Sequence, residues 1–132
     1  MLGMVDTTVL IDDSDIDLFI QRRFLEVYQF SKNLISYKSA EAALAWLGDT
    51  NGEIPPDIIF LDLNMPNVDG FGFLDGFKNL PQKIQDKSRI VVLTSSNSQK
   101  DRDLAFSYKN VIQFVTKPLK QADIEELKRI VI

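Results

Sequence analysis

Apolar residues occur along this chain in two patterns: short unbroken runs, and longer stretches where they recur every three or four residues. Unbroken runs are typical of strands buried on both faces of a parallel sheet. The helical spacing is typical of helices that turn one face to a core. Five strands are predicted, over residues 9–11, 33–37, 58–61, 89–93 and 113–116. The predicted helices cover residues 16–27, 40–47, 70–77, 98–108 and 123–132.

Capping residues and helix breakers mark the boundaries of these elements. Ser39 is placed to cap the helix at 40–47, and Ser98 with Asp101 has the spacing of a capping box. Pro81 follows the third helix, and residues 48–56 form a turn-rich loop. The helix at 98–108 is poor in apolar residues, so we expect it to be held weakly.

The helical spacing also predicts which side chains face the core. In the first helix the predicted inward positions are Ile16, Ile20, Phe24 and Val27. Several large aromatic side chains are expected to pack in the core or between helices: Phe19, Phe24, Trp46, Phe60, Phe71 and Phe77.

Strict alternation of strand and helix predicts a parallel sheet with helices on both faces. Right-handed crossovers leave few arrangements, and the order 2-1-3-4-5 is the common one for five strands. We therefore expect one α/β domain over residues 1–132, with a doubly wound, flavodoxin-like (βα)5 fold.

Composition narrows the classes of function. The chain has 132 residues, 45% hydrophobic and 26% charged, as expected of one soluble globular domain. It contains no cysteine and no histidine, which excludes disulfides, thiolate metal sites, histidine-ligated zinc and His-dependent hydrolases. Its net charge, 15 − 19 = −4, argues against direct binding to nucleic acid. With no signal-peptide pattern and no apolar stretch of the roughly 18 residues that a membrane span requires, we expect a cytoplasmic protein.

Polar residues stand where the apolar runs end. Asp12 and Asp13 follow the first strand, Asp62 follows the third, Thr94 the fourth, and Lys117 ends the fifth. In open α/β sheets the carboxyl ends of the strands form the ligand site, so these side chains are expected to gather at one edge. Buried carboxylates need a cationic partner, and Mg²⁺ prefers oxygen ligands. The pattern therefore indicates a site for a divalent cation and a phosphoryl group.

The order and spacing of these motifs closely resemble those of bacterial two-component response-regulator receiver domains, from Val9 to about Ile130. The motifs that carry the resemblance are Asp12-Asp13, the block from Ile58 to Pro66 with Asp69-Gly70 behind it, Leu93-Thr94-Ser95, and Lys117-Pro118. The resemblance also implies a cis peptide bond between Lys117 and Pro118, and X-Pro bonds tolerate that isomer.

The resemblance implies that Asp62 accepts a phosphoryl group from a phosphohistidine on a sensor histidine kinase or a histidine phosphotransfer protein. Mg²⁺, or Mn²⁺ in its place, would be bound directly by Asp13 and Asp62. The main-chain carbonyl of Asn64 would be a third ligand, and Asp12 would act through water. The chain would then be a signalling module with no output domain and no enzymatic activity beyond its own phosphorylation and dephosphorylation.

Two further residues would bind the phosphoryl group by this resemblance: Thr94 through a hydrogen bond and Lys117 through an ion pair. Phe114 stands where many receivers have tyrosine, and would change rotamer as Thr94 moves. This switch would alter the face formed by the helix at 98–108, the last strand and the last helix, which an unidentified effector protein would recognise. Asn110-Val111 replaces the small residue pair common in the family.

Three other interpretations are open. A haloacid-dehalogenase-type phosphatase also uses an aspartyl nucleophile, but it needs a second carboxylate two residues later, where this chain has Asn64. A flavodoxin-like cofactor carrier is disfavoured because the acidic loop at residues 12–15 would repel a flavin phosphate. A pseudo-receiver that binds partners without phosphorylation is disfavoured by the intact acidic residues.

Overall fold

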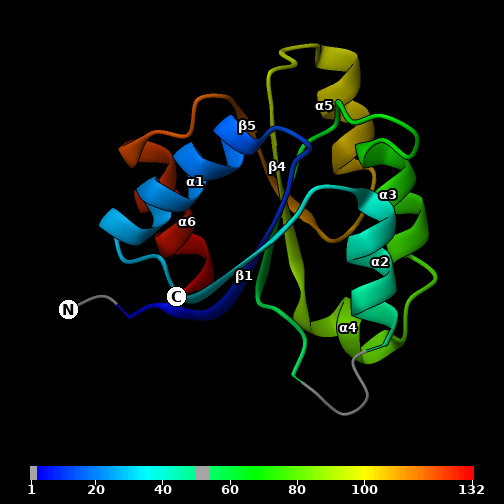
Figure 1. Ribbon diagram of the computed structural model, residues 1–132, viewed down its shortest axis with the longest axis horizontal. Helices are drawn as coiled ribbons and strands as arrows, with labels where there is room; N and C mark the ends of the chain where they lie inside the picture. Colours follow the sequence, from blue (N-terminus) through cyan, green and yellow to red (C-terminus); the bar gives the residue numbers. More distant parts are fainter. Residues whose placement is uncertain (1–2, 50–53) are drawn as a thin grey trace.

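The computed structural model describes residues 3–49 and 54–132. Its strands form one parallel sheet in the order β2-β1-β3-β4-β5, which confirms the predicted fold (Figure 1). The strands are β1 (Val5–Ile11), β2 (Ser31–Tyr37), β3 (Ile58–Leu61), β4 (Arg89–Thr94) and β5 (Val111–Thr116). The helices are α1 (Asp15–Val27), α2 (Ala40–Gly48), α3 (Gly70–Phe77), α4 (Gln82–Lys87), α5 (Gln99–Phe106) and α6 (Gln121–Val131).

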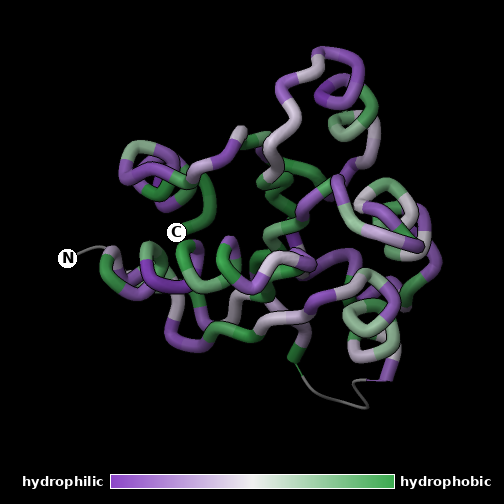
Figure 2. Tube along the Cα trace, turned by 45° about the horizontal axis from the view of Figure 1, so that its top comes forward, coloured by the Kyte–Doolittle hydropathy of each residue, from purple (hydrophilic) through white to green (hydrophobic). Residues whose placement is uncertain are grey.

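Helices cover both faces of the sheet. α1 and α6 lie on one face, and α2, α3, α4 and α5 lie on the other (Figure 1). Successive residues of a strand point to opposite faces, so Val9 and Ile11 join the core under α2 and α3, whereas Leu10 joins the core under α1 and α6. All residues of β3 are buried, as expected of a strand with helices on both sides. Green, hydrophobic segments accordingly run through the middle of the trace, and others lie along the helices (Figure 2).

The predicted inward face of α1 is wrong for Ile16, Ile20 and Val27, whereas Phe24 does pack, partly buried, against the core. Its buried residues are Leu18, Gln21 and Leu25, whereas Ile16 is 72% exposed and Val27 is 58% exposed. The helix carries apolar side chains on two faces, so spacing alone could not identify the face that packs on the sheet. The face of α1 that packs on the sheet depends on how the helix is rotated after β1, and this rotation places Gln21 beside Asp12.

Phe19 is also not a core residue, because it is 70% exposed. Ile16, Phe19 and Ile20 therefore form an exposed apolar cluster on α1. The other aromatic predictions are confirmed: Phe60 and Phe77 are buried, and the remaining three pack partly buried against the two cores.

The structure contains one helix that the pattern did not predict. α4 follows Pro81, and among its residues only Ile84 is buried, which is too weak a periodic signal for a six-residue helix. The side-chain amide of Asn110 donates hydrogen bonds to the carbonyl oxygens of Gln85 (2.6 Å) and Ser88 (2.9 Å). Asn110 thus binds the end of α4 to the start of β5, which gives a structural role to a residue that departs from the family pattern.

Most predicted boundaries agree with the structure to within a few residues, and the largest difference is β1, which begins at Val5. Ser39 caps α2 as predicted. Only half of the predicted capping box forms at α5: Ser98 Oγ accepts from the Asp101 amide, but the Asp101 carboxylate accepts from Ser96 Oγ. Residues 50–53 of the predicted loop lie outside the described residues. Among the residues that are described, no helix is long and apolar enough to cross a bilayer.

Candidate phosphoacceptor site

The strand register brings the predicted site residues to one edge of the sheet. Ile11 of β1 pairs with Leu61 of β3, so Asp12 and Asp62 follow neighbouring strands at the same level. Thr94 pairs with Thr116 at the ends of β4 and β5, and Lys117 follows directly. The prediction that four separate strand ends converge is therefore confirmed.

Lys117 is the centre of the site. Its Nζ lies 2.7 Å from Asp12 Oδ2, 2.8 Å from Asp17 Oδ2 and 3.1 Å from Asp62 Oδ2. Burial acts to lower the pKa of Lys117, but hydrogen bonds to Asp12 and Asp17 and the charge of Asp62 raise it above that of an ordinary lysine. The ammonium group is therefore charged throughout the physiological pH range.

The backbone around Asp62 fixes its carboxylate. The Asp62 amide donates to the Ile11 carbonyl (3.0 Å), and the Asn64 amide donates to Asp62 Oδ1 (3.1 Å). Gly70, the first residue of α3, lies so close that a Cβ there would stand 2.6 Å from the Asp62 carbonyl oxygen. A side chain at position 70 would push α3 away from the end of β3, which explains the glycine.

Asp12 is 1% exposed, yet each of its oxygens has a partner. Oδ1 accepts from the Ser14 amide (2.9 Å), and Oδ2 accepts from Gln21 Nε2 (3.1 Å) and from Lys117. These contacts meet the requirement that a buried carboxylate be hydrogen-bonded and paired.

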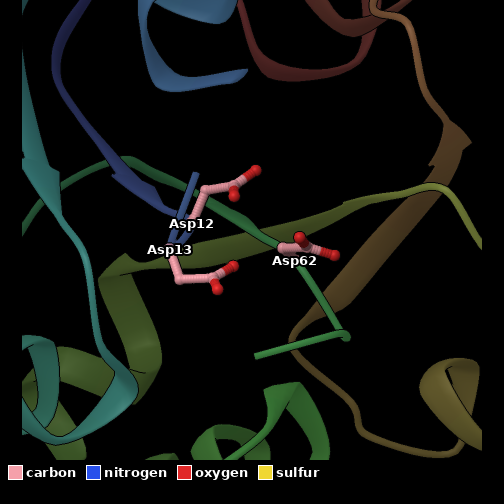
Figure 3. Close-up of side chains that lie close together, drawn as sticks. All are labelled: Asp12, Asp13 and Asp62. Carbon is pink, nitrogen blue, oxygen red and sulfur yellow. The ribbon is translucent and has the colours of Figure 1, made fainter. Parts of the chain in front are cut away.

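Asp12, Asp13 and Asp62 form an all-oxygen cluster at the ends of β1 and β3 (Figure 3). One carboxylate oxygen from each residue lies within 4.8 Å of the others. Asp13 is exposed and has no ion pair among the described residues. With Asp17, the site holds four carboxylates, three of which contact the single ammonium, so its formal local charge is −4 + 1 = −3. The donor set and this excess negative charge fit a hard divalent cation such as Mg²⁺.

Thr94 ends β4, which neighbours β3 on the side away from β1. Its hydroxyl oxygen accepts from Asn64 Nδ2 (3.3 Å) and from the Ser96 amide (3.4 Å). The hydroxyl proton has no acceptor among the described residues. The Lys117 amide donates to the Thr94 carbonyl (2.8 Å), which ties the two strand ends together. The Lys117-Pro118 bond is cis, as the resemblance implied.

Phe114 is already buried, at 6% exposure, with the guanidinium carbon of Arg102 5.5 Å from its ring centroid. The same guanidinium lies 5.6 Å from the centroid of Phe106. The ring thus packs beneath α5 in this structure, one of the two rotamers that the predicted switch requires.

Sequence reasoning missed three residues of the site. Ser14 and Gln21 support Asp12, and Asp17 contacts Lys117 directly. The sequence did contain a signal for these residues. The helix α1 begins only three residues after Asp12, so its first turns must lie over the strand ends. The failure followed from choosing the wrong face of α1.

Comparison with known proteins identifies the family. The family model of the response regulator receiver domain matches residues 8–129, so this chain belongs to that family. Receiver domains are signalling modules of two-component systems.

The chain is similar to a two-component response regulator from Cytophaga hutchinsonii, whose crystal structure superposes with a TM-score of 0.89, at 30% identity and with 97% of both chains covered. It is 30% identical to the response regulator Rcp1 of Synechocystis, covering 88% of this chain and 79% of Rcp1. The Mn²⁺-bound form of Rcp1 superposes with a TM-score of 0.73, covering 96% of this chain and 91% of that one.

Longer proteins also contain a similar segment. The chain is 28% identical to part of the hybrid signal transduction histidine kinase L of Dictyostelium discoideum, covering 96% of this chain and 7% of that protein. The chain therefore spans a small fraction of this relative's length.

Proposed function

We propose that this chain is a phosphorylation-dependent signalling module in which Asp62 accepts a phosphoryl group from a phosphohistidine. The observation that carries the proposal is the contact of Lys117 Nζ with Asp62 Oδ2, 3.1 Å apart, beside two further strand-end carboxylates. A carboxylate held by its own backbone and facing a fixed ammonium is a positioned nucleophile next to a preformed site for negative charge.

In the transfer, an Asp62 carboxylate oxygen attacks the phosphorus atom and forms an O–P bond. The N–P bond of the donor breaks, and its electron pair stays on the imidazole nitrogen. Lys117 neutralises charge on one phosphoryl oxygen, and the Thr94 hydroxyl donates its proton to another. Such a reaction needs positioning and charge neutralisation more than a covalent intermediate on other side chains.

Asp13 and Asp62 would hold Mg²⁺ directly, with the Asn64 carbonyl, while Asp12 would act through water. When bound, the metal supplies positive charge against the attacking carboxylate and the phosphoryl oxygens. The Mn²⁺-bound form of the similar protein Rcp1 supports a divalent cation in this type of domain.

The proposed switch passes from Thr94 to α5 through two hydrogen bonds. The Ser96 amide donates to Thr94 Oγ1, and Ser96 Oγ donates to Asp101 in the first turn of α5 (2.8 Å). When Thr94 binds a phosphoryl oxygen, these contacts rearrange. α5 follows because only Ala105 anchors it in the core. An effector protein would then recognise the altered face formed by α5, β5 and α6.

The donor would be a sensor histidine kinase or a histidine phosphotransfer protein. The apolar cluster Ile16, Phe19 and Ile20 supports a protein donor, because exposed apolar clusters of this kind are typical of protein contacts. Ile20 shares a surface hollow with Asp17, Lys117 and Pro118, so the cluster continues to the site itself. A protein that covers α1 would place its histidine at Asp62.

The phosphatase alternative is less well supported, because Asn64 offers only an amide where a general acid is needed, and this amide contacts Thr94 and Ser95. The second candidate is a module that binds its partners without being phosphorylated. The experiment below distinguishes the two candidates, because such a module would take up no phosphoryl group.

The experiment uses acetyl phosphate with Mg²⁺ and intact-protein mass measurement. The wild-type chain should gain one phosphoryl group, and Asp62→Asn should gain none. Asp57→Asn is the matched control: Asp57 is an aspartate at the opposite end of β3, where it pairs with Lys87 (2.7 Å), and its substitution should leave uptake intact. No uptake by the wild type, or equal uptake by Asp62→Asn, would reject the proposed acceptor.

A further inference from the structure

Lys117 reaches from the end of β5, at one edge of the sheet, to Asp12 at the end of β1, and it requires an anchor to stay there. A lysine side chain has four rotatable bonds and loses substantial conformational entropy when it is fixed. A lysine that binds a phosphoryl oxygen only after transfer has begun would lose this entropy during the reaction itself. One that is fixed beforehand loses it on folding, as preorganised catalytic groups do.

The ammonium group has three protons, and the structure gives each an acceptor: Asp12 at 2.7 Å, Asp17 at 2.8 Å and Asp62 at 3.1 Å. Asp12 and Asp17 both belong to the segment from the end of β1 to the first turn of α1. They are held by that segment whatever happens at Asp62. When an Asp62 oxygen becomes part of an acyl phosphate, its contact with Lys117 weakens and one ammonium proton becomes available.

We propose that Asp17 is a positioning residue that, with Asp12, holds the Lys117 ammonium in place, so that the proton shared with Asp62 passes to a phosphoryl oxygen. This inference rests on the proposed function, because that function makes Asp62 the acceptor. The contact between Asp17 and Lys117 is observed independently of that function. Asp17 itself touches neither the acceptor carboxylate nor the incoming group.

Asp17 also has an opposing effect, since its negative charge repels a phosphoryl dianion. The Asp17 side chain is 38% exposed, whereas that of Lys117 is 16% exposed. Solvent therefore screens the longer-range repulsion more than it weakens the direct 2.8 Å contact. Positioning is the larger effect, and removal of Asp17 should slow phosphoryl acceptance.

The chain offers a matched control in Asp15. Asp15 and Asp17 both lie in the first turn of α1, where each acidic side chain favours the positive end of the helix dipole. Asp15 pairs with Lys38 at the surface (3.0 Å) and does not contact Lys117. Asp15→Ala thus removes the same helix-terminus contribution as Asp17→Ala without affecting the lysine.

The first measurement uses the protein without metal or phosphate. Lysine ammonium protons exchange rapidly with water unless hydrogen bonds protect them, so the ¹H–¹⁵N signal of Lys117 reports its anchoring. The signal should be visible in the wild type and in Asp15→Ala, and should broaden or vanish in Asp17→Ala. A signal that persists unchanged in Asp17→Ala would overturn the inference.

The second measurement is the rate of phosphorylation by acetyl phosphate in a double-mutant cycle with Lys117→Met. Asp17→Ala should slow the reaction about three- to tenfold, the range expected from losing one partly exposed charge-assisted hydrogen bond. In the Lys117→Met background the same substitution should no longer slow the reaction, because only the repulsion by Asp17 is then removed. An equal loss in both backgrounds would show that Asp17 acts through the stability of α1 and would overturn the proposal.

These outcomes are separable from failure of the proposed function. If the wild type took up no phosphate, the acceptor assignment would fail. The ammonium signal would still show whether Asp17 anchors Lys117.

Discussion

Lys117 Nζ and Asp62 Oδ2 lie 3.1 Å apart although 55 residues separate them along the chain and β4 lies between β3 and β5 in the sheet. The same ammonium binds Asp12, which is almost fully buried. One lysine from the last part of the chain therefore pairs with carboxylates that follow β1 and β3 in the first half. Its removal would leave two buried carboxylates without a cation.

Lys117→Met should therefore destabilise the fold. We expect the free energy of unfolding to fall by about 2–4 kcal/mol, near the range measured when one partner of a buried ion pair is removed. Urea unfolding at neutral pH with a chelator present measures this. Lys38→Met is the control, because the exposed pair of Lys38 and Asp15 should contribute less than about 1 kcal/mol. Equal losses in the two variants would contradict the view that Lys117 is the central cation.

Tyr108 predicts how stability depends on alkaline pH. Its hydroxyl donates to Asp75 Oδ1 (2.6 Å), and this hydrogen bond, with burial, raises the pKa of Tyr108 to about 12. An unfolded chain has a tyrosine pKa of roughly 10. The folded state therefore holds this proton more tightly, and the resulting stability is complete below pH 10 and lost as pH rises toward 12.

The measurement is urea unfolding of wild type and Tyr108→Phe at several pH values between 9 and 12. The wild type should lose stability across this window more steeply than Tyr108→Phe, which lacks the titrating group. Lysines titrate in both proteins, so the difference between the two curves isolates Tyr108. Parallel curves would show that the hydrogen bond to Asp75 does not form in solution.

The apolar runs and their alternation with helices predicted the parallel sheet, because strands buried on both faces are apolar throughout. The strand order followed from right-handed crossovers and from the order that is common for five strands. That Asp12, Asp62, Thr94 and Lys117 gather at one site could be predicted because parallel strands end at the same edge of the sheet. The individual contacts within the site could not be predicted from the sequence, because Asp17 reaches Lys117 only when α1 packs through Leu18 and Leu25. The periodicity of α1 favoured its other apolar face.

Divalent cations should stabilise the folded protein. Asp13 has no ion pair among the described residues, so a cation bound with Asp62 would relieve repulsion that Lys117 leaves in place. At 100 times its dissociation constant, such a ligand adds about 2.7 kcal/mol by linkage. Mg²⁺ should raise the Tm of the wild type, and Asp13→Ala should abolish most of this rise. Asp6→Ala, which removes another exposed carboxylate of the β1 region, should retain it. A full Mg²⁺ response in Asp13→Ala would place the cation elsewhere.

The switch predicts a local change in α5. Beryllofluoride, which mimics a phosphoryl group, should alter amide hydrogen exchange between Thr94 and Phe106. Ser96→Ala should uncouple this response, because it removes the hydrogen bond from Ser96 to Asp101. Ser107→Ala, which removes a hydroxyl at the other end of α5, should retain it. Exchange changes confined to the β1 and β3 ends would rule out this route.

The apolar cluster on α1 predicts a difference between protein donors and small donors. Phe19 is 70% exposed, so its replacement by serine should cost little stability, and it leaves every contact of Lys117 in place. Phe19→Ser should therefore accept phosphate from acetyl phosphate at the wild-type rate. Transfer from a phosphorylated histidine kinase domain should slow at least about tenfold, as expected when a central interface aromatic is lost.

Ile130 on α6 supplies the control for this prediction. It is 41% exposed, it is apolar, and it lies on a different helix from the cluster. Ile130→Ser should leave transfer from both kinds of donor unchanged. If Phe19→Ser slowed both reactions alike, the residue would act on the site itself. If it slowed neither, the donor would approach Asp62 over a surface other than α1.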